Sequence, residues 1–209
     1  RAQAQSAALR ADVLRRLSAE PARNDFAVVA AKLISHVDTV AALRHLDTLL
    51  ARPYGDMFWM YECAGFARVT RDVLPEPYRT RLRTAWKIFT PYRGDTENHF
   101  LMHYGSLLLM SELWPGLPRE EWFMHRSSRE IHREANEYLR HWLRVVRERG
   151  LSEWSSPRYG YYYITPLIEL ATYAKSETLR AECRSALEVL LAEQAVTYLR
   201  RSATGAHSR

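Results

Sequence analysis

Helical segments of two kinds alternate along the sequence, and this alternation constrains the fold more than any other feature. Segments of the first kind are apolar on most sides, and segments of the second kind have one charged face. A helix that is apolar all round must be buried, whereas an amphipathic helix covers a core with one side. The pattern therefore predicts inner, buried helices backed by outer, amphipathic ones. The inner segments are 57–73, 98–114 and 161–174, and the outer segments are 78–89, 127–149 and 177–201.

The rest of the chain also has helical periodicity, without the strict alternation that is typical of strands. We expect further helices at 7–17, 25–35 and 38–50, a turn at 52–56 and a polar loop at 90–97. This many elements exceeds a four-helix bundle, and no exact repeat indicates a TPR or HEAT array. The sequence therefore predicts a single all-α domain over residues 1–209, built from helical hairpins in an incomplete (α/α) toroid.

Composition restricts the partners of this chain without identifying one. The net charge of +6 favours an anionic partner, but the arginines are scattered, and the densest basic stretch, 79–83, fits a solvated helix face. We therefore expect no nucleic acid partner. No apolar run reaches the roughly 18 residues that a membrane span requires, so we expect no span. The two cysteines, Cys63 and Cys183, lie in apolar helical stretches, which favours buried free thiols over a disulfide.

Unusual sequence precedes or opens two of the inner helices. The first segment, 94–99, is Gly-Asp-Thr-Glu-Asn-His, and the second, 153–161, is Glu-Trp-Ser-Ser-Pro-Arg-Tyr-Gly-Tyr. Both segments place titratable side chains at a helix N-terminus, where backbone N–H groups and the helix dipole favour anions. We therefore expect any active site to lie at the loops that contain these two segments.

The Thr-Glu-Asn-His and Glu-Trp-Ser-Ser-Pro-x-Tyr segments resemble those of α/α-toroid polysaccharide lyases, of the alginate-lyase-like and heparinase II/III-like kinds, and their uncharacterised relatives. The resemblance covers about residues 94–174. It implies β-elimination on an acidic, uronate-containing polysaccharide or oligosaccharide, without a cofactor, in a periplasmic or secreted protein. A complete toroid of six hairpins with its companion β-domain needs a longer chain, so the resemblance also implies a fragment, a degenerate relative or a smaller toroid.

β-Elimination requires a base for the C5 proton of the uronate, a group that holds its carboxylate, and an acid for the leaving oxygen. The resemblance implies that Asn98 holds the carboxylate, with Arg158 as a second group, and that His99 is the base. It implies that Tyr159, or with less support Tyr161, protonates the leaving oxygen or acts as a base. The residues predicted to bind substrate are Arg158, Glu97, Glu153, Trp154, Tyr161 and His103.

The catalytic candidates also have plain structural interpretations. Asn98 fits a helix N-cap, and His99 fits a histidine whose hydrogen bonds are satisfied at a helix start. Residues 159–163 fit packing around the turn at Gly160, and for Tyr162 and Tyr163 we prefer that interpretation.

Three functional alternatives follow from the same residues. Glu97 and Glu153 permit a glycoside hydrolase in which two carboxylates flank the bond. A helical scaffold or binding module without catalysis fits the fold equally well. His99 and His103, four residues apart on one helix face, are suited to a metal, but a complete site needs a third ligand and no HExxH motif is present, so we expect no metal.

Overall fold

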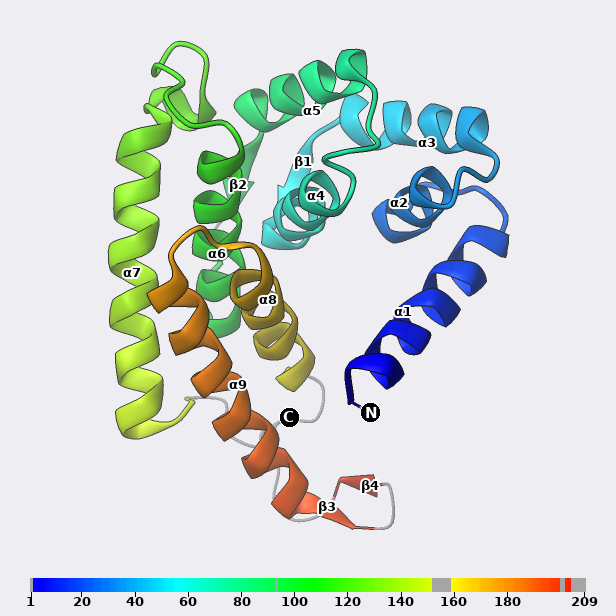
Figure 1. The fold of residues 1–209 in the computed structure, drawn as a ribbon. Helices are drawn as coiled ribbons and strands as arrows, with labels where there is room; N and C mark the ends of the chain where they lie inside the picture. The colour runs from blue at the N-terminus through cyan, green and yellow to red at the C-terminus, as the bar shows by residue number, and fades with distance from the viewer. Residues whose placement is uncertain (1, 93, 152–158, 200–201, 204–209) are drawn as a thin grey trace. The chain divides into compact units, whose positions relative to one another are not determined.

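The computed structural model describes residues 2–92, 94–151, 159–199 and 202–203, and this part of the chain is dominated by α-helices (Figure 1). The predicted all-α class is therefore confirmed. Segment 123–125 forms a single 3₁₀ turn, η1 (Phe123–His125). The α-helices are α1 (Ala2–Ala19), α2 (Phe26–Ile34), α3 (Thr39–Ala51), α4 (Met57–Val69), α5 (Glu76–Ile88), α6 (Glu97–Leu113), α7 (Ser128–Arg149), α8 (Gly160–Tyr173) and α9 (Glu177–Thr197).

Four very short strands accompany the helices, and the sequence analysis predicted none of them. They are β1 (Tyr54–Asp56), β2 (Thr90–Tyr92), β3 (Tyr198–Leu199) and β4 (Ser202–Ala203). β1 and β2 form one two-stranded sheet, and β3 pairs with β4 in an antiparallel sheet. The sequence analysis also expected the last helix to reach residue 201, and this is wrong, because α9 ends at Thr197 and β3 begins at Tyr198. Segments of two or three residues are too short to show the alternation by which strands are recognised.

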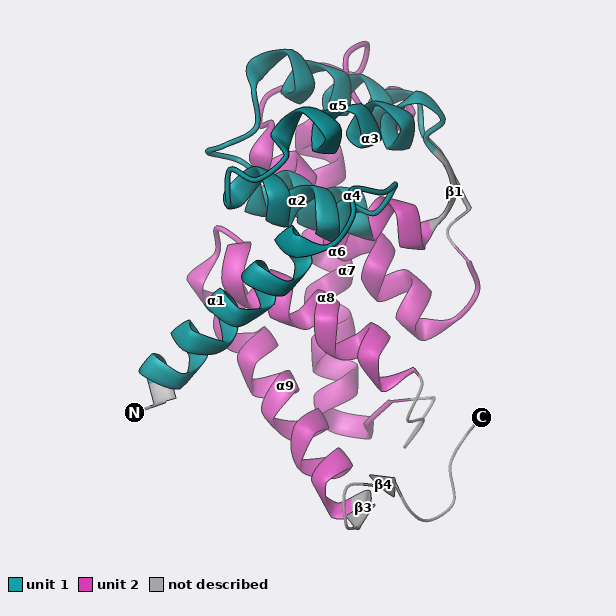
Figure 2. Ribbon diagram, turned by 90° about the vertical axis from the view of Figure 1, so that its right-hand side faces the viewer, with its two compact units in different colours: residues 1–54, 62–90 teal, residues 55–61, 91–209 magenta. Residues whose placement is uncertain are grey.

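The chain divides into two compact units, which Figure 2 shows in different colours. Unit 1 comprises residues 1–54 and 62–90, and unit 2 comprises residues 55–61 and 91–209. Helix α4 belongs to both, because its first five residues lie in unit 2 and the remainder in unit 1.

In unit 1, α2 packs against both α1 and α3, and α3 packs against α5. Asp25 is the N-cap of α2, and its side chain accepts hydrogen bonds from two backbone N–H groups of the first turn. The buried Lys32 donates from Nζ to the carbonyl oxygen of Ser18 at 3.0 Å and lies 3.6 Å from the carboxylate of Asp38. These bonds offset the cost of burying an ammonium group and tie α2 to the end of α1.

In unit 2, the helix contacts form a closed circuit, in which α6 packs on α7 and α8, and α9 packs on α7 and α8. Helix α6 is the most deeply buried element of this circuit, because every residue from 101 to 112 is buried. Apolar residues on all sides of α6 require this placement. The sequence prediction of a buried inner helix in this region, backed by an amphipathic segment at 127–149, is confirmed by these contacts.

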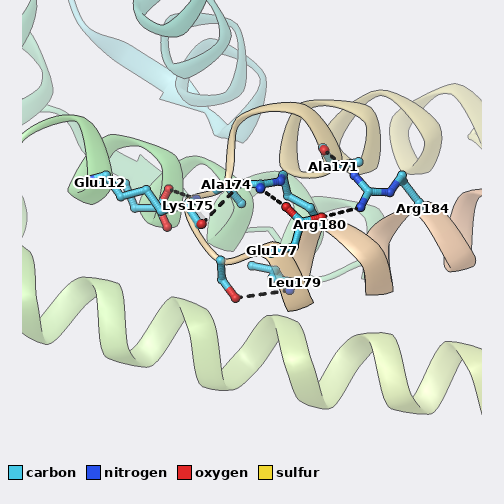
Figure 3. Close-up of polar contacts among 9 residues, drawn as sticks. Glu112, Ala171, Ala174, Lys175, Glu177, Leu179, Arg180 and Arg184 are labelled. Carbon is cyan, nitrogen blue, oxygen red and sulfur yellow. Dashed lines mark hydrogen bonds and ion pairs between the residues drawn. The ribbon is translucent and has the colours of Figure 1, made fainter.

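The C-terminal end of α6 is tied to the turn between α8 and α9 by a buried carboxylate (Figure 3). Glu112 accepts a hydrogen bond from the backbone N–H of Lys175 at 2.9 Å, and its other oxygen lies 3.4 Å from Nε2 of His132. In the same turn, the guanidinium of Arg180 donates to the carbonyl oxygen of Ala174 at 2.6 Å. The last turn of α8 and the first turn of α9 are thus fixed by side chains.

Helix α7 begins at a capping box. Oγ of Ser127 accepts from the N–H of Glu130 at 3.3 Å, and the Glu130 carboxylate accepts from the N–H of Ser127 at 2.8 Å. The hydroxyl of Ser127 also donates to the Glu130 carboxylate at 2.8 Å, and the backbone and hydroxyl bonds from Ser127 to this carboxylate hold the pKa of Glu130 below its usual value. Gly150 ends the helix with a φ of 76°, a conformation that glycine adopts without strain.

Both cysteines are buried and free, as predicted. Burial raises the pKa of both thiols, and that of Cys183 rises to about 12. Neither thiol is therefore activated as a nucleophile. Within the described residues, no helix combines the length and apolarity needed to cross a membrane.

The capping box gives a direct test of the α7 start. We expect Ser127→Ala to lower the free energy of unfolding by about 1 kcal/mol, because the N–H of Glu130 loses its acceptor. Urea unfolding followed by circular dichroism measures this change. Arg133→Ala, an exposed position on the same helix, serves as the control. Equal stability of Ser127→Ala and the native chain would contradict the assigned cap.

Candidate functional site

The predicted first loop leads directly into α6 in the structure. The N-cap of α6 is Thr96, whose side chain makes no capping bond, so the interpretation of Asn98 as the N-cap is wrong. Asn98 lies inside the first turn, is 1% exposed, and accepts a hydrogen bond from Oγ1 of Thr96 at 3.3 Å. The side chain is therefore turned into the protein rather than presented to solvent.

His99 follows on α6 and is partly exposed. The ring meets the ring of Phe58 edge to face, with 5.7 Å between centroids and 84° between planes. Nδ1 of His99 makes no hydrogen bond to the described residues. The backbone of Gly94, at φ 77°, lies against the ring of His99. A Cβ on Gly94 would lie 2.7 Å from Cε of Met57 and closer still to Nδ1 of His99. Only glycine fits at this point.

Glu97 joins three helices of unit 2. One carboxylate oxygen accepts from Nε1 of Trp142 on α7 at 3.0 Å, and the other accepts from the hydroxyl of Tyr163 on α8 at 3.4 Å. The rings of Trp142 and Tyr163 lie nearly parallel, with centroids 6.3 Å apart, and both are buried. A carboxylate held this way by two buried donors fixes the first turn of α6 against its neighbours.

The tyrosines of the second predicted segment lie at the start of α8. Tyr159 is the N-cap residue and is partly exposed, whereas Tyr161 is 59% exposed. Tyr162 packs edge to face on Phe58 at 5.0 Å and on Tyr161 at 5.3 Å. The preferred packing interpretation of Tyr163 is confirmed by its 1% exposure.

Phe58 therefore connects the two predicted loops, because His99 of α6 and Tyr162 of α8 both pack on its ring. The sequence analysis placed Phe58 only in an apolar helix and did not assign it to the site. Arg158, Glu153 and Trp154 lie outside the described residues.

His103, one turn further along α6, lies in the core rather than at the helix end. It is 6% exposed and meets Tyr104 edge to face at 5.0 Å, and Tyr104 stacks on Tyr138 at 3.9 Å. Among the described residues, no three histidine, cysteine, aspartate or glutamate side chains gather in a way that would hold a metal ion.

The structure adds a titratable pair that the sequence analysis did not identify. Glu169 of α8 hydrogen bonds to Tyr61 of α4, and Tyr61 also hydrogen bonds to Thr165. Burial raises the pKa of Glu169 to about 8, so that its carboxyl group is mostly protonated at neutral pH. Burial, followed by the nearby Glu169, also raises the pKa of Tyr61.

A weak signal for this pair is present in the sequence. Tyr161, Thr165 and Glu169 follow one another at intervals of four residues and therefore share one face of α8. A glutamate on an otherwise apolar helix indicates a buried carboxyl group, but its partner Tyr61 is distant in sequence. The pairing could not be recognised without the packing of α4 and α8.

The raised pKa of Glu169 gives a pH-dependent stability. The folded chain keeps this proton up to about pH 8, whereas the unfolded chain releases it near the ordinary value of 4.5. The stabilising contribution is therefore complete below the lower value and is lost as the pH rises through the higher one. In the native chain this loss of unfolding free energy has a slope of up to about 1.4 kcal/mol per pH unit. We expect the loss to be absent in Glu169→Gln, because the glutamine side chain stays neutral at every pH.

Urea unfolding at a series of pH values between these limits measures the difference. Glu137→Gln, at an exposed position on α7, should leave the pH dependence of the native chain unchanged. Parallel pH profiles for Glu169→Gln and the native chain would mean that the carboxyl group of Glu169 is not held protonated.

Comparisons with known proteins do not assign this chain to a family. No family model, no curated protein and no solved structure matches this chain. The resemblance of the two loop segments to toroid lyases therefore remains a prediction from their residues, and a function has to be argued from the chemistry of the side chains.

Proposed function

We propose that this chain is a carbohydrate-active domain, incompletely toroidal, whose polar and aromatic residues around Phe58 carry lyase-like β-elimination on an acidic, uronate-containing polysaccharide. The observation that carries the proposal is the shared packing of His99 and Tyr162 on Phe58. It joins the start of α6 to the start of α8, the two helix ends where the sequence predicts the catalytic groups.

His99 is the proposed base. Its ring is oriented by Phe58 and is partly exposed, whereas its Nδ1 is buried and makes no hydrogen bond to the described residues, so the proposed basic atom is Nε2. A neutral imidazole is a suitable general base for the C5 proton of a uronate. The close approach of Gly94 fixes the side of the ring that faces the loop.

A hydroxyl or carboxyl group that carries a proton at neutral pH has to protonate the leaving oxygen. Tyr159 is the proposed acid, with Tyr161 as the exposed alternative on the same turn. The hydrogen-bonded Glu169 and Tyr61 lie on the same two helices, α8 and α4, that supply Tyr162 and Phe58. After each turnover His99 releases the C5 proton to solvent and the acid regains a proton from solvent, which closes the cycle.

Holding the uronate carboxylate requires a donor that substrate can reach. Asn98 points into the protein and is bonded to Thr96. We therefore propose Arg158, the second candidate for this role, as the principal carboxylate clamp, since a guanidinium binds a carboxylate through two parallel hydrogen bonds.

The hydrolase alternative receives less support from the same geometry. Its proposed carboxylate on α6, Glu97, accepts hydrogen bonds on both oxygens from Trp142 and Tyr163. Protonating a glycosidic oxygen from this group would break a contact that holds three helices together. A scaffold without catalysis is the remaining alternative, and an activity assay distinguishes it from both enzymes.

The protein is incubated with alginate, heparan sulfate, hyaluronan and polygalacturonate, and the ultraviolet absorbance of the unsaturated uronate product is followed. We expect an increase on at least one polymer. It should fall by about 100-fold or more in His99→Ala and in Tyr159→Phe, because each removes a proton-transfer group. His141→Ala and Tyr78→Phe, which change the same residue types at positions with no proposed catalytic role, are the matched controls and should retain activity.

Absence of product on every polymer, with the protein folded, would contradict the lyase. A reducing-sugar assay on the same samples then distinguishes the two alternatives. Sugar released without unsaturation selects the hydrolase, and no release selects the scaffold.

A further inference from the structure

A groove between α7 and α9 in unit 2 is distinct from the residues around Phe58. Its volume is about 170 Å³. Arg140, Arg144 and Arg147 of α7 form one wall, and the floor is aliphatic, with Leu143, Val146 and Val189. The cavity is smaller than the several hundred Å³ of a small-molecule site, and its size suits one or two aliphatic side chains inserted from a larger partner.

The arginine wall belongs to a longer basic stripe. Arg129, Arg133, Arg140, Arg144 and Arg147 are all exposed, and at 100° per residue they fall within about 60° of arc on α7. The acidic residues of α7 lie on a neighbouring arc, so positive charge is concentrated beside the groove. The sequence analysis described the arginines as scattered because their spacing along the chain hides this alignment.

Few of these arginines are neutralised. In the described part of the chain, Arg140 lies 3.7 Å from the carboxylate of Glu182 across the groove, and Arg144 donates to Nδ1 of His141. No carboxylate within ion-pair distance accompanies Arg144 or Arg147 there. Their guanidinium groups are therefore available to an acidic partner.

An exposed apolar line on α9 extends the floor. Val189 is 41% exposed and Val196 is 88% exposed, and both lie on one side of the helix because they are seven residues apart. Valines exposed at this spacing beside a groove match the contact positions of a third helix packed against two others. The floor contains no aromatic ring on which a sugar would stack.

We propose that the groove between α7 and α9 binds an acidic amphipathic α-helix of a protein partner. The partner inserts aliphatic side chains, spaced three and four residues apart, between Leu143 and Val189. Its glutamates or aspartates then face Arg144 and Arg147. This binding is independent of the proposed catalysis, because none of the residues that line the groove contacts the rings of Phe58, His99 or Tyr162 in a described interaction.

Selection from a display library of 20-residue peptides against the full chain tests the proposal. We expect the enriched peptides to be acidic, with aliphatic residues three and four positions apart. Fluorescence anisotropy with the best enriched peptide then measures its affinity for the native chain and for variants. In Arg144→Glu/Arg147→Glu we expect the affinity to fall about tenfold or more, and Val189→Asp should weaken it similarly.

Arg129→Glu/Arg133→Glu is the matched control, because it makes the same charge change on the same helix outside the groove. This variant should change the affinity by less than about threefold. Equal losses in the two double variants, enrichment of peptides without acidic residues, or no enrichment would overturn the proposal. Displacement of the selected peptide by a heparin oligosaccharide, with equal affinity for a scrambled peptide, would overturn it in favour of a general polyanion surface.

Discussion

The burial of α6 is the constraint on which the rest of unit 2 depends. A helix whose residues are buried continuously from 101 to 112 leaves no face for solvent, so α7 and α8 have to pack against it. Its two buried or partly buried glutamates then need partners. Glu97 finds them in Trp142 and Tyr163, and Glu112 finds one in the backbone of Lys175. These bonds make the packing specific, because sliding α6 by one turn would leave both carboxylates without them.

The same constraint places the chemical groups. Because Glu97 fixes the first turn of α6, His99 is held where its ring meets Phe58, and Tyr162 reaches that ring from α8. The pair of Glu169 and Tyr61 adds a carboxyl group that keeps its proton at neutral pH, on the helix that also supplies Tyr162. The proposed acid–base chemistry depends on this rigid frame, because it orients the partly exposed ring of His99.

Helices could be predicted from the sequence because their signals are local. The cap at Asp25, the capping box at Ser127 and the stop at Gly150 all depend on residues within a few positions. The site was predicted only in part. Its two helix starts were identified, but Phe58, Tyr61 and Glu169 gain their roles from contacts between distant helices. Asn98 was assigned from residue type, and its 1% exposure depends on packing that no local pattern records.

Native-state hydrogen exchange of the backbone amides tests the central place of α6 most directly. The account predicts that amides in the middle of α6, such as those of Leu107 and Leu108, exchange only through global unfolding. Their exchange free energies should equal the free energy of unfolding and exceed those of the exposed end of α9 near Val196. Exchange of the α6 amides through a lower-energy opening, with the end of α9 still protected, would contradict it.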